Sequence, residues 1–114
     1  MPLLSIVTNQ PLAGTERAAA LRHLSASVAN ALGKPERYVM VSYRHNPDML
    51  FAGSDAPLAY LELKSIGLPA ERTTELSAIL AEAMAEHLGV APDRVYIEFA
   101  DAERPMWGWN GSTF

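Results

Sequence analysis

Residues 32–43 read Leu-Gly-Lys-Pro-Glu-Arg-Tyr-Val-Met-Val-Ser-Tyr, and this stretch decides the fold. A helical pattern reaches Leu32, and Gly33 followed by Pro35 stops it, because proline lacks the amide hydrogen that a helix needs. From Arg37 to Tyr43 the chain is rich in β-branched and aromatic residues, which favour a strand. The stretch therefore predicts the end of a helix followed directly by a strand.

The same pattern returns in residues 88–99, which read Leu-Gly-Val-Ala-Pro-Asp-Arg-Val-Tyr-Ile-Glu-Phe. Upstream of each copy, Thr15-Glu16-Arg17 corresponds to Ala70-Glu71-Arg72, and the three pairs of landmarks are separated by 55 to 57 residues. Landmarks that recur in order at a nearly constant spacing indicate an internal repeat. We interpret the chain as one domain, residues 1–114, that contains a duplication of about 1–56 and 57–114.

Each predicted half consists of a strand, a helix and a strand. The first helix is expected to begin near Thr15, as a helix-capping residue, and to end at Gly33; the second begins after Pro69 and ends at Gly89. Strands are expected at Pro2–Thr8, Arg37–Tyr43, Leu58–Ser65 and Val95–Ala100, with shorter strand patterns at Met49–Ala52 and Met106–Trp109. A crossover helix makes the two strands of each half parallel. The predicted fold class is α/β (α+β), a four-stranded mixed sheet with two helices on one face.

The first two predicted strands carry apolar side chains on both faces, although two helices can cover only one. Val41 and Tyr43 face away from Met40, and Leu4 faces away from Leu3. Strands that are apolar on both faces are usually buried on both, and monomers rarely expose large apolar patches. We therefore predict a homo-oligomer. The alternative is that the tail after residue 100 folds back over the open face.

Composition excludes several classes of function. Of the 114 residues, 49% are hydrophobic and 19% charged, and the net charge is −4. This acidic balance argues against nonspecific nucleic-acid binding, and no apolar run reaches the ~20 residues of a membrane span. The chain has no cysteine, which excludes disulfides, thiol chemistry and thiolate metal sites. The start of the chain lacks a signal-peptide pattern, so a cytoplasmic location is expected.

Pro2 is the candidate with the clearest chemistry. Removal of Met1 would leave Pro2 with a free secondary amine, whereas its nitrogen is an amide while Met1 stays attached. Burial near Ile66 and the tryptophans, and a nearby Lys34 cation, would lower the pKa of that amine. A neutral amine near pH 7 is suited to general-base catalysis. Taken alone, a Met-Pro start is more often without consequence.

Other polar residues are weaker candidates. Lys34 follows a helix end, where a cation ordinarily interacts with the helix dipole. Residues 65–67, Ser-Ile-Gly, end a predicted strand, where a free backbone N–H can bind an oxyanion. The three histidines, His23, His45 and His87, are expected to lie far apart, so no metal site is predicted.

The C-terminal tail is unusually aromatic. Trp107, Trp109 and Phe114 all fall within the last eight residues. Such rings either seal an interface between subunits or line a pocket for an apolar or aromatic ligand. The sequence leaves both interpretations open.

Five groups of residues occur here in an order that is characteristic of one protein family. They are Met1-Pro2 with Thr8-Asn9, Gly33-Lys34-Pro35 with Tyr38, Ser65-Ile66-Gly67, Ala91-Pro92-Asp93-Arg94-Val95-Tyr96-Ile97, and Gly108-Trp109-Asn110 with Ser112-Thr113-Phe114. On these residues the chain resembles macrophage migration inhibitory factor and its relatives in the tautomerase superfamily. The resemblance runs nearly end to end, and the run from Pro92 to Ile97 and the tail are its most specific parts.

The resemblance implies a homotrimer in which three sheets form a central barrel ringed by six helices. It also implies an isomerase, a keto–enol tautomerase of phenylpyruvate-like aromatic α-keto acids or dopachrome that needs no cofactor. Pro2 would be the general base, Lys34 would bind the substrate carboxylate, and the backbone N–H of Ile66 would contact a substrate oxygen. The neighbouring subunit would donate Tyr96. The remaining pocket residues implied by the resemblance are Tyr38, Trp109 and Phe114.

The chain departs from the family pattern at three places. Residues 58–61, Leu-Ala-Tyr-Leu, stand where the animal cytokine has Cys-x-x-Cys, so thiol oxidoreductase activity is excluded. Glu98 replaces a pocket asparagine and Trp107 replaces a small pocket residue, and both changes bear on substrate preference. The alternative functions are a cytokine-like trimer that binds a protein partner and has an idle pocket, and a purely structural trimer.

Overall fold

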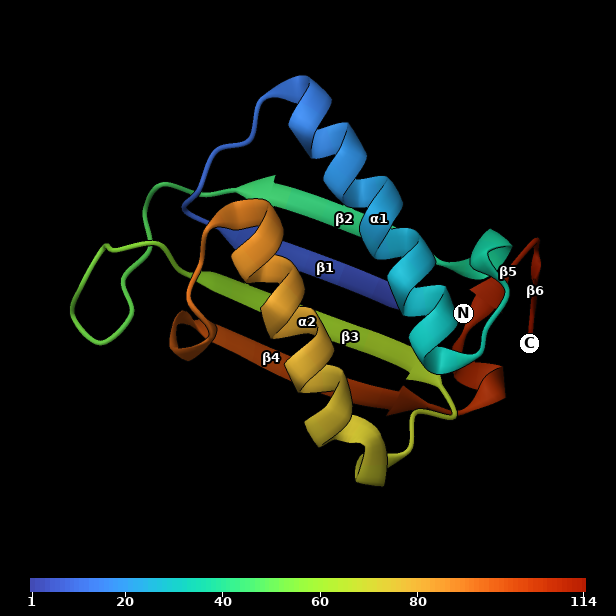
Figure 1. Ribbon diagram of the computed structural model, residues 1–114. Coiled ribbons are helices and arrows are strands. Elements are labelled where there is room, and N and C mark those ends of the chain that lie inside the picture. Colours follow the sequence, from blue (N-terminus) through green and yellow to red (C-terminus); the bar gives the residue numbers. More distant parts are fainter.

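Two strand–helix–strand units build the computed structural model, which describes residues 1–114 (Figure 1). The main elements are β1 (Leu3–Thr8), α1 (Gly14–Leu32), β2 (Met40–His45), β3 (Ala59–Ile66), α2 (Thr73–Leu88) and β4 (Val95–Ala102). A two-stranded hairpin of β5 (Gly108–Trp109) and β6 (Ser112–Thr113) follows. The sheet order is β2-β1-β3-β4; β1 runs parallel to β2, β3 parallel to β4, and β1 antiparallel to β3. Both helices lie on one face, so the predicted fold class is confirmed.

Both helices end at the predicted glycines. Gly33 has a φ of 63° and Gly89 a φ of 66°, and the backbone N–H of each donates to a carbonyl of the last helical turn. This left-handed conformation suits glycine, which has no Cβ to clash. The start of α1 differs from the prediction, because Thr15 lies inside the helix and Ala13 occupies the capping position without a side-chain hydrogen bond. The start of α2 is preceded by a short 3₁₀ turn, Ala70–Arg72, directly after Pro69.

The expected strands are present, with shifted boundaries. The largest shift is in β2, which begins at Met40 because residues Glu36–Tyr38 form a 3₁₀ turn rather than the start of a strand. The short strand predicted at Met49–Ala52 is wrong; this loop contains only an isolated bridge between Phe51 and Ser54. The strand predicted at Met106–Trp109 is reduced to β5, since Arg104–Met106 is another 3₁₀ turn.

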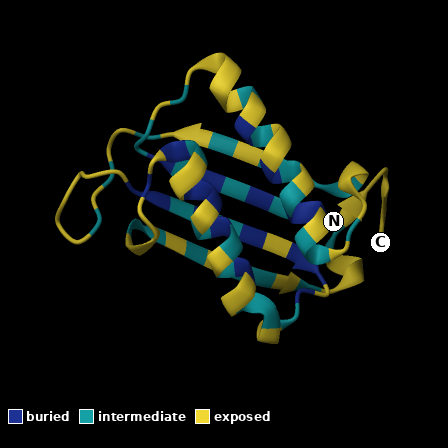
Figure 2. Ribbon diagram, in the orientation of Figure 1, coloured by how far each residue is buried: buried dark blue, intermediate teal, exposed yellow.

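The core lies between the sheet and the helices (Figure 2). Alternate residues of the two inner strands point into it, and Leu4, Leu61 and Leu63 are at most 1% exposed. The helices contribute an apolar stripe that packs on these residues, made of Leu24, Val28, Leu76, Leu80, Ala83, Met84 and Leu88. Two amphipathic helices on one sheet face thus bury the strands on that side only. None of the helices has the length and hydropathy needed to cross a bilayer.

The opposite face of the sheet stays open in the single chain. Met40 is 65% exposed and Tyr96 66% exposed on this face. The C-terminal tail does not cover it, because the β5–β6 hairpin lies beyond one end of the sheet, next to the N-terminus (Figure 1). The expectation of an apolar open face is only partly met, since Lys64 and Glu62 form an ion pair of 3.3 Å there and Lys64 is the register partner of Leu3.

Leu61→Ala tests the packing of this core. Leu61 is fully buried, so its truncation removes apolar contacts and leaves a cavity, and we expect a loss of about 2–5 kcal/mol in the free energy of unfolding. Urea denaturation followed by circular dichroism measures it. Leu61→Met conserves volume and is the matched control, expected to cost less than about 1.5 kcal/mol. Equal losses in the two variants would contradict this account of the core.

Candidate active site

Pro2 lines a cavity of about 410 Å³ at the end of the sheet where β1 begins. Pro2 itself is less than 2% exposed. The other lining residues come from the start of β1, the 3₁₀ turn before β2 and the C-terminal tail: Met1, Leu3, Arg37, Tyr38, Val39, Met40, Trp107, Gly108, Trp109 and Phe114. The chain therefore brings its N-terminus and its aromatic tail together around one space, although they are far apart in sequence.

Local backbone structure explains how Pro2 is held. The backbone N–H of Met40 donates to the Pro2 carbonyl oxygen at 3.0 Å, which continues the parallel pairing of β1 with β2. Pro2 cannot donate a backbone hydrogen bond, so its place at the very start of a strand leaves no buried amide donor unpaired. Pro2 is thus tied by its backbone carbonyl to the edge of β2, directly before the first residue of β1.

Three aromatic rings form the wall of the cavity. Tyr38 meets Trp109 edge-on, with ring centroids 5.4 Å apart, and meets Phe114 edge-on at 5.5 Å. The rings of Trp109 and Phe114 are stacked at 5.5 Å. The backbone N–H of Phe114 donates to the carbonyl oxygen of Trp107 at 3.2 Å, which ties the end of the chain to the hairpin. Edge-to-face and stacked rings at these distances stabilise a defined arrangement.

A cation lies close to the N-terminal amine. The pKa of the Met1 amino group is lowered below its ordinary value of 8.0, first by burial and then by the charge of Lys34. The Nζ of Lys34 donates to the carbonyl oxygen of Ile66 at 3.0 Å. A lysine ammonium carries three donors, so Lys34 has further donors for a ligand. Lys34 and Ile66 thus contact each other, and Lys34 is close enough to the Met1 amine to act on its pKa. Neither residue lines the Pro2 cavity, and the contact uses the carbonyl oxygen of Ile66 rather than its N–H, so their roles stay a prediction.

Arg37 was not among the residues singled out from the sequence. It lines the cavity, and its guanidinium lies 4.7 Å from the centroid of the Tyr38 ring. The signal that could have found it is its position directly before Tyr38, in a segment read as the start of a strand. Because that segment is a 3₁₀ turn, Arg37 and Tyr38 can both reach the cavity instead of pointing to opposite faces.

Two of the expected site residues do not reach Pro2 within one chain. Tyr96 is near the start of β4, at the opposite end of the sheet (Figure 1), with its ring centroid 4.6 Å from that of Phe51. The β1–β3–β4 register places Pro2 level with the far end of β4, five residues beyond Tyr96. At about 3.3 Å per residue this is a separation of roughly 17 Å along the strands. Tyr96 must therefore belong to a different surface of the single chain.

Glu98 lies on the open sheet face, away from the cavity. The Tyr60 hydroxyl, which has a single proton, donates a short hydrogen bond to Oε2 of Glu98, and its oxygen also lies 3.1 Å from Oε1 of Glu62, the alternative acceptor. The hydrogen bond to Glu98 is the main reason that the pKa of Tyr60 is raised above its usual range; desolvation and Glu62 add to it. The three side chains form a connected polar cluster on β3 and β4.

The sequence-based expectation that the histidines lie far apart is wrong for two of them. The ring centroids of His23, on α1, and His87, on α2, are 4.8 Å apart. The two helices run side by side over the sheet, which brings together residues that are far apart along the chain. His45, at the end of β2, is not part of this pair.

The arrangement defines a class of protein: a domain of two strand–helix–strand units with a buried proline at position 2 beside an aromatic cavity. The family model for macrophage migration inhibitory factor (MIF) matches residues 1–114. The chain is 40% identical to a macrophage migration inhibitory factor homolog of Brugia malayi, covering 100% of this chain and 99% of that protein. It is 36% identical to macrophage migration inhibitory factor of Mus musculus, with the same coverage.

Solved structures agree with these sequence matches. A homologue of macrophage migration inhibitory factor from Prochlorococcus marinus is 42% identical, with a TM-score of 0.91 and 98% of each chain covered. The Toxoplasma gondii protein is 33% identical, also with a TM-score of 0.91, over 98% of this chain and 99% of that one. The chain belongs to the macrophage migration inhibitory factor family.

Lys34→Gln tests the electrostatics of the amine. Without the ammonium charge, the pKa of the N-terminal amine should rise towards 8.0 but stay below it, because burial remains the larger cause of the lowering. An NMR titration of the first residue measures this pKa. Arg44→Gln removes an equal charge from the far end of β2, where Arg44 is exposed and pairs with Val7, and should leave the pKa of the amine unchanged. An amine that titrates identically in wild type and Lys34→Gln would contradict the assignment.

Proposed function

We propose that this protein is a keto–enol tautomerase of aromatic α-keto acids of the phenylpyruvate type, or of dopachrome, that works without a cofactor. The observation that carries the proposal is the buried Pro2 at an aromatic-lined cavity. Beside it, burial and the charge of Lys34 lower the pKa of the Met1 amino group. Removal of Met1 turns the Pro2 nitrogen into a secondary amine, and the burial and the Lys34 charge that act on the Met1 amine should lower its pKa in the same direction. Such an amine is neutral over a wider pH range than an ordinary chain terminus.

The proposed reaction moves one proton and changes no oxidation state. In the direction from keto to enol form, the Pro2 nitrogen takes a proton from the carbon next to the carbonyl group. The electron pair of the broken C–H bond forms the C=C bond, and the π pair of the carbonyl group moves to its oxygen. The protonated Pro2 amine then returns the proton to that oxygen. The reverse direction uses the protonated Pro2 amine as the acid. A single group whose pKa lies near the working pH can serve in both roles.

Charge and shape favour an aromatic acid as substrate. Lys34, whose charge acts on the terminal amine, and Arg37, which lines the cavity, place two cations near Pro2 in a chain whose net charge is −4. A carboxylate is attracted by these cations, and guanidinium groups bind carboxylates with two parallel hydrogen bonds. The rings of Trp109 and Phe114 suit an aromatic side chain by stacking. Trp107 narrows the same cavity and is expected to limit substrate size.

The proposed active unit is a homotrimer. One chain leaves Tyr96 exposed and far from Pro2, and it leaves its sheet face open. A second chain that covers this face would protect the exposed apolar residues and bring its own Tyr96 to the Pro2 cavity of its neighbour. Analytical ultracentrifugation should then give three times the chain mass of 12.4 kDa.

The cytoplasmic location expected from the sequence also stays a prediction.

Pro2→Gly tests the base. Using protein whose mass shows that Met1 is absent, we expect phenylpyruvate turnover to fall by about 10²–10⁴-fold, the usual contribution of a positioned general base. The wild-type kcat/KM should rise with pH through the pKa of the Pro2 amine, because only the neutral amine accepts a proton. Burial and the Lys34 charge, which lower the pKa of the chain terminus, should shift this rise to lower pH. Stopped assays at constant ionic strength measure both quantities.

Pro47→Gly, in an exposed loop, is the matched control and should retain wild-type turnover. Pro2→Gly must sediment as the wild type does. Turnover that survives in a trimeric Pro2→Gly protein would overturn the role of Pro2. A wild type that is inert on both phenylpyruvate and dopachrome would overturn the proposed reaction and leave the protein-binding alternative.

Mixed trimers test the donation of Tyr96 between subunits. Pro2→Gly chains and Tyr96→Ala chains, each impaired alone, are unfolded together in equal amounts and refolded. Random assembly pairs an intact Pro2 with an intact neighbouring Tyr96 in about a quarter of the pockets, so activity should return to about that fraction. If Tyr96 serves its own chain or plays no part at the cavity, the mixture will not exceed the mean of its two components.

A further inference from the structure

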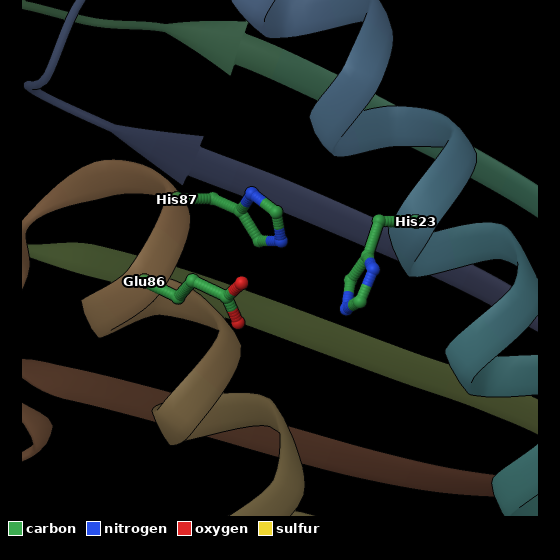
Figure 3. Close-up of side chains that lie close together, drawn as sticks. All are labelled: His23, Glu86 and His87. Carbon is green, nitrogen blue, oxygen red and sulfur yellow. The ribbon is translucent and has the colours of Figure 1, made fainter.

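Two histidines and a glutamate converge on the outer surface of the two helices, outside the Pro2 cavity (Figure 3). His23 comes from α1, and Glu86 and His87 come from the end of α2. One ligand atom of each residue, an imidazole nitrogen or a carboxylate oxygen, lies within 4.8 Å of the others. Figure 3 shows both imidazole rings and the carboxylate turned into the space between the helices. No part of the proposed tautomerase reaction uses these residues.

The structure leaves one atom of this cluster without a partner. His87 Nε2 is buried and has no hydrogen bond, although buried polar atoms in proteins are nearly always paired. An unpaired buried nitrogen costs free energy unless water or an ion satisfies it. The ring of His23 faces the His87 ring across the helix interface, with ring centroids 4.8 Å apart and an interplanar angle of 52°. A shared ligand between the two rings would supply the missing interaction.

The donor set selects the kind of ion. Imidazole nitrogens suit zinc and the neighbouring transition metals, whereas Mg²⁺ and Ca²⁺ prefer shells of oxygen. Two histidines and one glutamate are a set that zinc uses when water occupies the fourth position. Zinc bonds of about 2.0–2.2 Å put tetrahedral ligands about 3.4 Å apart. The ligand atoms lie within 4.8 Å of one another, so binding requires them to move closer; the His23 and Glu86 side chains are exposed and have room to adjust.

We propose that His23, Glu86 and His87 bind one Zn²⁺ per chain and that the ion fastens α1 to α2. The two helices belong to the two halves of the duplicated fold, and each covers its own part of the sheet. An ion that binds all three residues is available only to the folded chain, since His23 lies far along the sequence from the other two. Binding to the native state alone stabilises it in proportion to ion concentration. The proposed ion has a structural role, crosslinking the two helices, and its site is separate from the Pro2 cavity.

Calorimetric titration of the metal-free, full-length protein with ZnCl₂ tests the proposal. The wild type should bind one Zn²⁺ per chain, and its Tm should rise with Zn²⁺ and fall back with EDTA. His23→Gln should weaken Zn²⁺ binding at least about tenfold. Loss of a residue that only hydrogen-bonds to a metal ligand already costs about that much, and His23 is proposed to be a ligand itself. Glu86→Gln should weaken it in the same direction. Both side chains are exposed, so these variants are expected to fold, which circular dichroism in EDTA verifies.

His45→Gln is the matched control, because it removes the third histidine of the chain without touching the cluster. It should bind Zn²⁺ with wild-type affinity and show the same rise in Tm. The proposal is overturned if His23→Gln binds as tightly as the wild type or if His45→Gln loses as much as His23→Gln. It is also overturned if the wild type shows no saturable binding. Phenylpyruvate turnover is not a readout, so failure of the tautomerase proposal would leave this test intact.

Discussion

The position of β1 as an inner strand is the constraint on which the rest of the structure depends. Its Leu4 and Ile6 are buried against the helices, while its two edges pair with β2 and β3. Because β1 is paired on both edges, the residue before it is also held in place: the backbone N–H of Met40, in β2, donates to the carbonyl oxygen of Pro2. The end of the chain, ordinarily its most mobile part, is thereby placed in a packed and ordered environment.

That environment explains the chemistry proposed for the terminus. Burial disfavours a charged amine, and the neighbouring Lys34 disfavours it further, so both causes act in the same direction on the pKa. The aromatic tail completes the cavity, because Trp109 and Phe114 pack on Tyr38 at the end of the sheet. At the opposite end of the sheet, Tyr96 packs against Phe51, which lies in a loop. A single chain thus places Tyr96 far from the Pro2 cavity, and the proposed trimer would bring the Tyr96 of one chain to the cavity of its neighbour.

Most of the fold could be predicted from the sequence because its signals are local. Glycines and prolines end each helix, and apolar periodicity identifies the helices and strands. The errors fall where local signals compete: Arg37 and Tyr38 suit a strand by composition, yet they adopt a 3₁₀ turn after Pro35. Pro2, Lys34, Ile66 and the aromatic tail were identified through a family resemblance, since a lone Met-Pro or a lone lysine after a helix has no specific meaning.

The sequence by itself determined the order of the elements, with strand–helix–strand occurring twice, and the residue types available for chemistry, because these depend on neighbours along the chain. Only the tertiary structure decided which residues meet. It brought Arg37 to the cavity, tied Glu98 to Tyr60 across two strands, and placed His23 beside His87 across two helices. Such contacts depend on the packing of elements that are distant in sequence. The periodicity within a single helix or strand does not predict such contacts. Each of the two histidines, for example, is compatible with an ordinary helix surface.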